Sequence, residues 1–294
     1  MLAVIVFLHL HHYIRYNRFN DTKECYWMTK VTMENNSLNE IPMLSMYPEG
    51  AEKLPLVFYI HGYGSNKEQA LDFGYMLAKE GFYFVSFDCQ AHGTRTDKTN
   101  KFSKVYPPET GLDSYVHMHE VIEQTGEDVQ RLIEHFSMKK EIDADRIGLT
   151  GFSAGGYATF YTAANNTKIK AAVPVGGKPS FYKAWQDMIL AASTNKQWSL
   201  GIIAAEKETK ERNNYFQKLD PVEKMKDYYP KPLLIVNGDQ DTVVLFNYSL
   251  DLYRDLLPVY AGYPENLQLS IPVIDHHFTI EMKTEVMSWF KKHL

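Results

Sequence analysis

The amino-acid sequence predicts an α/β fold, in which a mostly parallel central sheet is covered by helices on both faces. Short apolar runs alternate with segments of helical spacing from about residue 54 to the C-terminus. The apolar runs are continuous, which is typical of strands that are buried on both faces. No internal repeat or low-complexity tract appears, and one domain fits the 294 residues better than two.

The predicted elements follow one another in a simple order. Two β segments, residues 24–33 and 41–47, are joined by a polar turn at 35–37 and form an antiparallel lead-in. Strands are then predicted at 54–60, 82–87, 146–150, 169–175, 232–236 and 267–274, and helices at 67–79, 115–136, 156–164, 243–257 and 279–293.

Residues 178–231 form a segment that is too long for a simple crossover, and they predict a small helical cap. Its large apolar and aromatic side chains are expected mostly to pack against the rest of the domain, with a minority lining a substrate pocket. They are Phe181, Tyr182, Trp185, Met188, Ile189, Trp198, Tyr215 and Phe216.

The composition limits the possible partners and compartment. A formal charge of -5 without a basic stripe argues against a nucleic-acid partner. Cys25 and Cys89 are the only cysteines and cannot form a CxxC motif, which favours a reducing, cytoplasmic compartment. We expect neither a metal nor a cofactor.

The N-terminal residues 1–27 are predicted to be an extension ahead of a folded domain at 28–294. The apolar run 2–8 is too short to span a bilayer. It lacks the basic start and the small-residue cleavage site of a signal peptide. Attachment of residues 1–20 to a membrane surface is an alternative that fits less well.

A G-x-S-x-G pattern at residues 151–155 places Ser153 between the strand 146–150 and the helix 156–164. A serine between strand and helix must lie on a sharp turn, where a Cβ on either flanking glycine would collide with its neighbours. The turn exposes the hydroxyl and directs the N-terminus of the helix at a bound group. In this context the pentapeptide predicts a nucleophile.

Such a serine needs a general base, and the base needs an orienting carboxylate. Asp241 follows the strand 232–236 just before the next helix, whereas Asp239, two residues earlier, fits the turn itself better. Turn or helix-capping roles are the alternative for both aspartates. After the last strand, His276 and His277 both offer a base. We favour His277 because it lies closer to the final helix and precedes an aromatic residue.

The order Ser153, Asp241, His277 resembles that of the α/β-hydrolase superfamily, over residues 28–294. The segment 61–64, His-Gly-Tyr-Gly, is similar to the oxyanion loop of that superfamily. The resemblance implies that the backbone N–H groups of Tyr63 and Ala154 bind the oxyanion, while the histidine of the loop braces it.

The segment 88–95 resembles the D-x-x-x-H-G-x-R loop of a narrower branch, the prolyl-oligopeptidase-like, dienelactone-hydrolase-like and acetyl-esterase-like serine hydrolases. Residues 143–148 and 289–294 fit the same branch. Many relatives carry glycine where this chain has His276, so the choice between the two histidines stays open.

The resemblance implies a serine hydrolase, and we expect a carboxylesterase that cleaves small-molecule esters through an acyl-enzyme on Ser153. Peptidases of this branch often carry an extra N-terminal domain, for which the short N-terminal segment leaves no room. A peptidase or an amide or thioester hydrolase is the alternative within the enzyme class. A non-catalytic binding protein is the alternative outside it.

Overall fold

The computed structural model describes residues 29–96, 111–194 and 206–294; the extension 1–27, Cys25 and Trp198 lie outside them. Eight strands form one sheet in the order β1-β2-β4-β3-β5-β6-β7-β8, with β1 and β2 antiparallel to their neighbours and the remaining strands parallel. This arrangement confirms the predicted fold class. The strands are β1 (Val31–Leu38), β2 (Ile41–Pro48), β3 (Leu54–Ile60), β4 (Tyr83–Phe87), β5 (Ile142–Phe152), β6 (Ala171–Val175), β7 (Leu233–Val236) and β8 (Leu267–Ser270).

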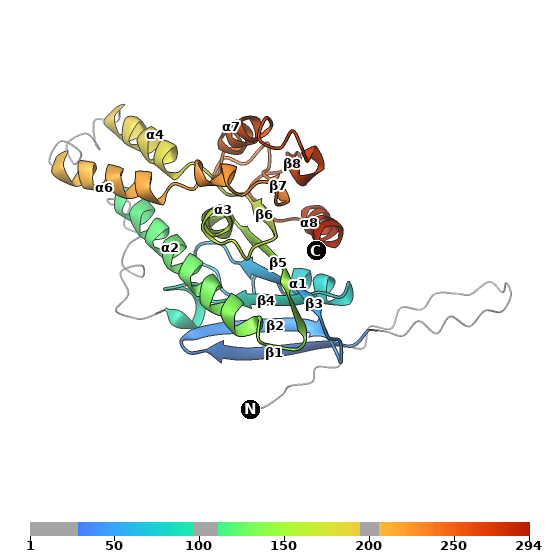
Figure 1. Cartoon of the computed structure of the whole chain (residues 1–294). Helices are drawn as coiled ribbons and strands as arrows, with labels where there is room; N and C mark the ends of the chain where they lie inside the picture. The colour runs from blue at the N-terminus through green and yellow to red at the C-terminus, as the bar shows by residue number, and fades with distance from the viewer. Residues whose placement is uncertain (1–28, 97–110, 195–205) are drawn as a thin grey trace, which may run out of the picture.

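Helices cover both faces of the sheet (Figure 1). One apolar cluster joins the sheet to α1 (Leu71–Lys79) and α8 (Ile280–His293). The other joins it to α2 (Gly111–Phe136), α3 (Ala154–Asn165) and α7 (Asn247–Leu256). Alternate residues of β3 belong to opposite clusters, and every residue of this strand is buried. The sequence of β3 is therefore a continuous apolar run, because each face of the strand packs into a separate core.

The described parts of the segment between β6 and β7 are largely helical, as predicted. They contain α4 (Phe181–Thr194), α6 (Glu206–Leu219) and the short 3-10 helix η4 (Lys224–Lys226), with α4 and α6 near the N-terminal end of α2 (Figure 1). The indole of Trp185 stacks on Phe216 with ring centroids 4.8 Å apart and donates a hydrogen bond of 2.7 Å to Asn213. Phe181 stacks on Tyr157 of α3. These aromatic side chains thus serve mainly to pack the two helices.

Several predicted boundaries are off by a few residues, for example those of β5 and α7, which the sequence predicts at 146–150 and 243–257, and two others are wrong for clear local physical reasons. The polar stretch 35–37 continues β1, and the chain turns at Asn39, whose φ of 52° a short amide side chain tolerates. Polar residues are acceptable in β1 because it is an exposed edge strand. At the other edge β8 ends at Ser270, since Pro272 has no N–H to extend the ladder.

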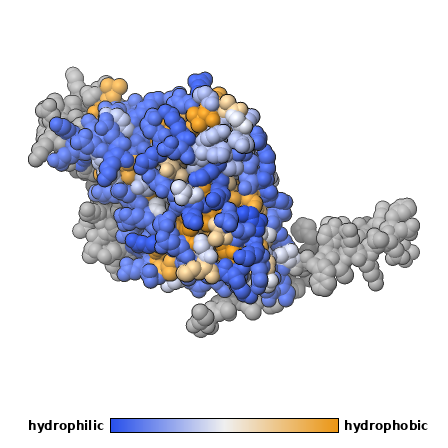
Figure 2. Space-filling model, viewed as in Figure 1, coloured by the Kyte–Doolittle hydropathy of each residue, from blue (hydrophilic) through white to orange (hydrophobic). Residues whose placement is uncertain are grey.

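Apolar side chains are concentrated in these two cores, and the face of the molecule in Figure 2 is mostly hydrophilic with small apolar areas. Among the helices that the structure describes, none combines the length and the apolar character that crossing a bilayer requires.

Candidate active site

Ser153 occupies the turn between β5 and α3, as the pentapeptide predicts. Its φ of 57° and ψ of −120° lie in a region that residues with a Cβ rarely adopt. The backbone N–H of Ser153 donates to Val175 at 2.9 Å, and its carbonyl accepts from Gly156 at 2.7 Å. The unusual conformation is therefore held by backbone contacts on both sides of Ser153.

The glycines that flank Ser153 are required by close backbone approach. A Cβ on Gly155 would overlap the carbonyl oxygen of Ile60 in β3. One on Gly151 would lie 2.6 Å from the same oxygen and 2.6 Å from the carbonyl oxygen of Gly155. Real Cβ atoms do not approach backbone so closely, so the steric reason expected from the sequence is confirmed.

Asp241 lies in the loop after β7 with its side chain only 2% exposed. One carboxylate oxygen, Oδ1, accepts hydrogen bonds from the backbone N–H groups of Val243 at 2.9 Å and Val244 at 2.8 Å. The other, Oδ2, lies 2.6 Å from Nδ1 of His276. Asp239 is an exposed residue of the preceding turn. Of the two aspartates, the structure brings Asp241 to a histidine and holds its carboxylate fixed.

His276 connects Asp241 to Ser153. Its Nε2 lies 2.9 Å from Oγ of Ser153, and its Nδ1 lies 2.6 Å from the carboxylate of Asp241. A carboxylate can only accept, so Nδ1 carries the proton of the neutral ring. Nε2 is then an acceptor for the serine hydroxyl. This is the geometry in which a histidine can remove the proton of a nucleophile.

His277 does not lie against Ser153, and the prediction that favoured it over His276 is wrong. Its side chain is 69% exposed, and its Nδ1 is hydrogen-bonded to the exposed carboxylate of Asp275. The aromatic residue that follows it misled the prediction: Phe278 packs inward, stacking on Tyr59 with ring centroids 6.2 Å apart. Exposure alternates along residues 274–278, so Phe278 and His276 lie on the inner side of this segment and His277 on the outer side.

The loop after β3 lies against the serine. A methyl group on Gly62 would be 3.5 Å from Cβ of Ser153, so the backbone of Tyr63, the next residue, follows directly beside it. Ala154 is the first residue of α3, and an N–H at this position has no acceptor within its helix. Both predicted oxyanion donors therefore belong to segments that border Ser153.

His61 braces this loop. Its Nε2 accepts a hydrogen bond of 3.1 Å from the backbone N–H of Cys89, so Nδ1 carries the proton and donates to the carbonyl of Gly62 at 2.8 Å. Burial lowers the pKa of His61 to about 4. A neutral ring is consistent with both bonds, because a doubly protonated ring could not accept one.

Two further side chains, Gln69 and Asp88, hold the loops near the serine. The sequence motifs indicated only Asp88. Gln69 accepts from the backbone N–H of Gly62 at 2.7 Å and from the hydroxyl of Tyr59 at 3.2 Å; no motif singles it out. Asp88, which begins the D-x-x-x-H-G-x-R segment, accepts from the backbone of Lys67 and of Thr94 at 2.9 Å each. Burial raises the pKa of Asp88, but these bonds outweigh it and leave the pKa below its usual value.

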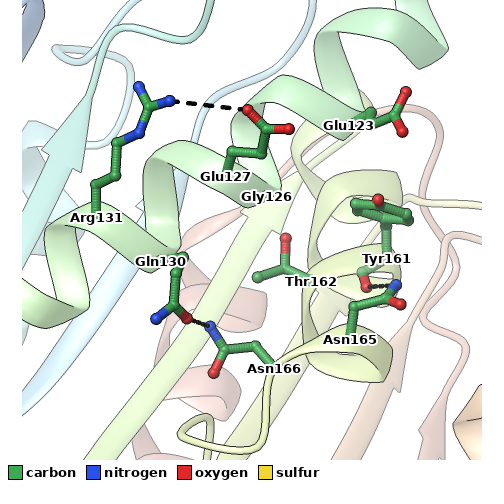
Figure 3. Close-up of a pocket in the computed structure, with 9 residues that line it drawn as sticks. All are labelled: Glu123, Gly126, Glu127, Gln130, Arg131, Tyr161, Thr162, Asn165 and Asn166. Carbon is green, nitrogen blue, oxygen red and sulfur yellow. Dashed lines mark hydrogen bonds and ion pairs between the residues drawn. The ribbon is translucent and has the colours of Figure 1, made fainter.

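A hollow of about 520 Å³ lies between α2 and the C-terminal half of α3 (Figure 3). The first residue of α3 in its lining is Tyr161, about 12 Å along the helix from Ser153 at the usual rise per residue. It therefore lies apart from the serine. Its lining residues are Glu123, Gly126, Glu127, Gln130, Arg131, Tyr161, Thr162, Asn165 and Asn166. Among the residues described, no group of three or more histidine, cysteine or acidic side chains is placed to hold a metal.

The arrangement can be compared with known proteins. The phospholipase/carboxylesterase family matches residues 45–187. The Bacillus subtilis (strain 168) protein named "Putative esterase YitV" is 26% identical over 268 residues, which cover 90% of this chain and 100% of that protein.

Solved structures share the fold. TT1662 from Thermus thermophilus is 20% identical with a TM-score of 0.65, over 90% of this chain and 98% of that one. An acetyl xylan esterase from Paenibacillus sp. R4 is 16% identical with a TM-score of 0.65, over 93% of this chain and 87% of that one.

The prolyl oligopeptidase family matches residues 118–294, more than half of the chain. The match includes the turn of Ser153 and the loops of Asp241 and His276. The chain therefore belongs to the prolyl oligopeptidase family and is a serine hydrolase with the α/β-hydrolase fold.

Proposed function

We propose that the protein is a carboxylesterase that cleaves small-molecule esters through a covalent intermediate on Ser153. The observation that carries this proposal is the continuous chain of hydrogen bonds from Ser153 through His276 to Asp241. A serine hydroxyl is unreactive at neutral pH until a base removes its proton, and this chain supplies the base and its orienting carboxylate.

In the proposed reaction, Oγ of Ser153 attacks the ester carbonyl while Nε2 of His276 takes the hydroxyl proton. Asp241 stabilises the imidazolium that forms. The backbone N–H groups of Tyr63 and Ala154 bind the oxyanion, and donors fixed in advance in this way contribute about 3 kcal/mol each. His276 then protonates the leaving alcohol, and a water molecule, activated by the same base, hydrolyses the acyl-enzyme.

Similarity to the carboxylesterase family and to an esterase-named relative favours an ester as the substrate. The alternative is an amide or peptide, because the chain's family is that of prolyl oligopeptidase, and an acylaminoacyl peptidase from Pyrococcus horikoshii shares the fold with a TM-score of 0.63 and 18% identity. This chain covers 42% of that peptidase. Rates with p-nitrophenyl esters of increasing chain length and with aminoacyl p-nitroanilides separate the two.

The central test uses Ser153→Ala, with Ser288→Ala on the exposed side of α8 as a matched control. A fluorophosphonate probe should label the wild type and the control but not Ser153→Ala, and ester turnover should follow the labelling. Ser153→Ala should keep the thermal stability of the wild type, because the replaced hydroxyl lies at a partly exposed site. Labelling or turnover that persists in Ser153→Ala would reject the mechanism.

We also place the enzyme in the cytoplasm as a single domain of residues 28–294. The free, buried thiol of Cys89 and the single sheet support these two proposals. Cell fractionation of the full chain beside a chain that begins at Met28 tests the compartment and any membrane attachment through residues 1–20. Recovery of the full chain with membranes would contradict the cytoplasmic assignment.

A further inference from the structure

Lys178 lies close to the proposed catalytic residues but is not used by the mechanism. It follows β6 through two glycines that touch the active site. A methyl group on Gly176 would lie 3.6 Å from Cε1 of His276, and one on Gly177 would overlap the backbone of Gly156, directly after the nucleophile turn. The backbone that leads into Lys178 is therefore fixed between the base and the start of α3.

The ammonium group of Lys178 is partly buried and has no hydrogen-bond acceptor among the described residues. It lies 5.0 Å from the ring centroid of Tyr248, and no carboxylate among the described residues forms an ion pair with it. Burial lowers the pKa of Lys178, while the more distant charges of Asp187 and Asp241 act in the opposite direction. Its three N–H donors are thus available to another molecule.

The two nearby carboxylates do not need Lys178. Asp241 already accepts from the backbone of Val243 and Val244 and from His276. Asp187 accepts a hydrogen bond of 2.6 Å from the hydroxyl of Tyr248. The ring face of Tyr248 accepts no hydrogen bond of ordinary strength, so among the described residues this partly buried ammonium keeps unsatisfied N–H donors, which is costly and points to a ligand.

Two further polar atoms without partners lie on this side of the molecule. His119, wholly buried on α2, donates through Nδ1 to the carbonyl of Tyr115 at 2.8 Å, and its Nε2 has no partner among the described residues. The buried hydroxyl of Tyr115 also lacks one there, and the two rings lie 4.3 Å apart. Burial lowers the pKa of His119, and the charge of Lys178 lowers it further, so the ammonium lies in the neighbourhood of this cluster.

We propose that Lys178 binds a carboxylate of the substrate, so that the enzyme prefers esters that carry a negative charge near the scissile bond. This proposal rests on the proposed esterase function. A carboxylate fits better than a doubly charged phosphate, because one lysine supplies one positive charge and Asp187 and Asp241 oppose a second negative one.

The test compares kcat/KM for two pairs of esters that share the reacting bond and differ only in charge. The acyl-side pair is p-nitrophenyl hydrogen succinate and p-nitrophenyl 4-methylpentanoate, in which an isopropyl group replaces the carboxylate. The alcohol-side pair is the acetate esters of 4-hydroxybenzoate and of 4-hydroxyacetophenone. The wild type should prefer the charged member of at least one pair, and the pair shows on which side of the ester the carboxylate binds.

Lys178→Met should lower that charged-to-neutral ratio about tenfold or more, the loss expected for one hydrogen bond to a charged group. Loss of the Lys178 charge could also change the electrostatic potential at Asp241. That change should affect kcat/KM of both members of a pair equally, because both undergo the same reaction, and so it leaves their ratio unchanged. Lys178→Arg should retain the preference. Lys183→Met is the matched control, because Lys183 also lies over the Tyr248 ring, at 5.3 Å, but is paired with Asp251.

Different failures are distinguishable in this experiment. If wild type and Lys178→Met hydrolyse both pairs with unchanged ratios, the assignment of Lys178 is wrong and the esterase function stands. If the wild type hydrolyses none of the four esters and Ser153 is not labelled, the esterase function itself is wrong, and the carboxylate subsite is rejected with it. Thermal melting of each variant confirms that the proteins compared are folded.

Discussion

The turn of Ser153 and the loop of His276 supply the two reacting side chains, but they are determined in different ways. At the turn, backbone atoms within a few residues and one neighbouring strand leave room only for glycine on both sides of the serine. In the loop 275–278 either histidine could face the serine, and the packing of Phe278 on Tyr59 and Phe152 selects one. Local sterics thus fix the nucleophile, whereas distant packing selects the base.

The largest effect is expected from Gly155→Ala, which would break the turn. Its Cβ would overlap the carbonyl oxygen of Ile60, and neither backbone segment can move without separating α3 from β3. We expect a loss of about 4 kcal/mol or more in the free energy of unfolding, or no folded protein. Gly50→Ala is the control: its φ of 75° is strained but no atom lies within 4 Å, so about 1 kcal/mol is expected there. Equal losses in urea unfolding would contradict the steric explanation.

The second prediction separates the two histidines. His276→Ala should reduce kcat/KM about 1,000-fold or more, since it removes the base that touches Ser153. His277→Ala should remain within about threefold of the wild type, because its side chain is exposed and pairs with the similarly exposed Asp275. Both variants should melt near the wild-type temperature. Steady-state kinetics with p-nitrophenyl acetate measures the difference, and the reverse order of activities would exchange the two assignments.

The third prediction concerns the pH dependence of stability and rests on His61, in the loop after β3. The pKa of His61 is about 4 in the folded protein and near 6.5 when unfolded, so only the unfolded chain takes up a proton between these values. Stability should therefore fall as the pH drops from about 6.5 to about 4, with a contribution from His61 of about 3 kcal/mol.

The variant His61→Asn removes this titration while other groups continue to titrate. The stability advantage of the wild type over the variant should shrink by that amount between pH 7 and pH 4, as measured by urea unfolding at each pH. An advantage that does not change with pH would show that His61 is not buried in its neutral form.

The smallest effect is expected from Phe278→Ala, which tests whether the packing of Phe278 positions His276. Phe278→Ala removes a partly buried ring that stacks on Tyr59 and Phe152, and should cost about 2 kcal/mol of stability. It should also lower kcat/KM about tenfold, because His276 loses the anchor that directs it inward. Phe278→Leu should recover part of both. If activity is unchanged while stability falls, another contact positions His276.

The α/β fold, the nucleophile Ser153 and the choice of Asp241 over Asp239 could be predicted because each depends on short-range pattern. Continuous apolar runs indicate strands covered on both faces, and a small-residue turn between strand and helix leaves the serine one conformation. Asp241 follows a predicted strand end by a few residues, and its carboxylate accepts the backbone N–H groups of Val243 and Val244 in the loop, although α7 itself begins only at Asn247.

Only the tertiary structure decided which histidine contacts the serine, that Gln69 holds the loop of Gly62, and that Lys178 has no carboxylate partner in the described part of the chain. Each of these depends on the direction of a side chain in an irregular segment. That direction is determined by contacts between residues far apart in the chain, which no local pattern encodes.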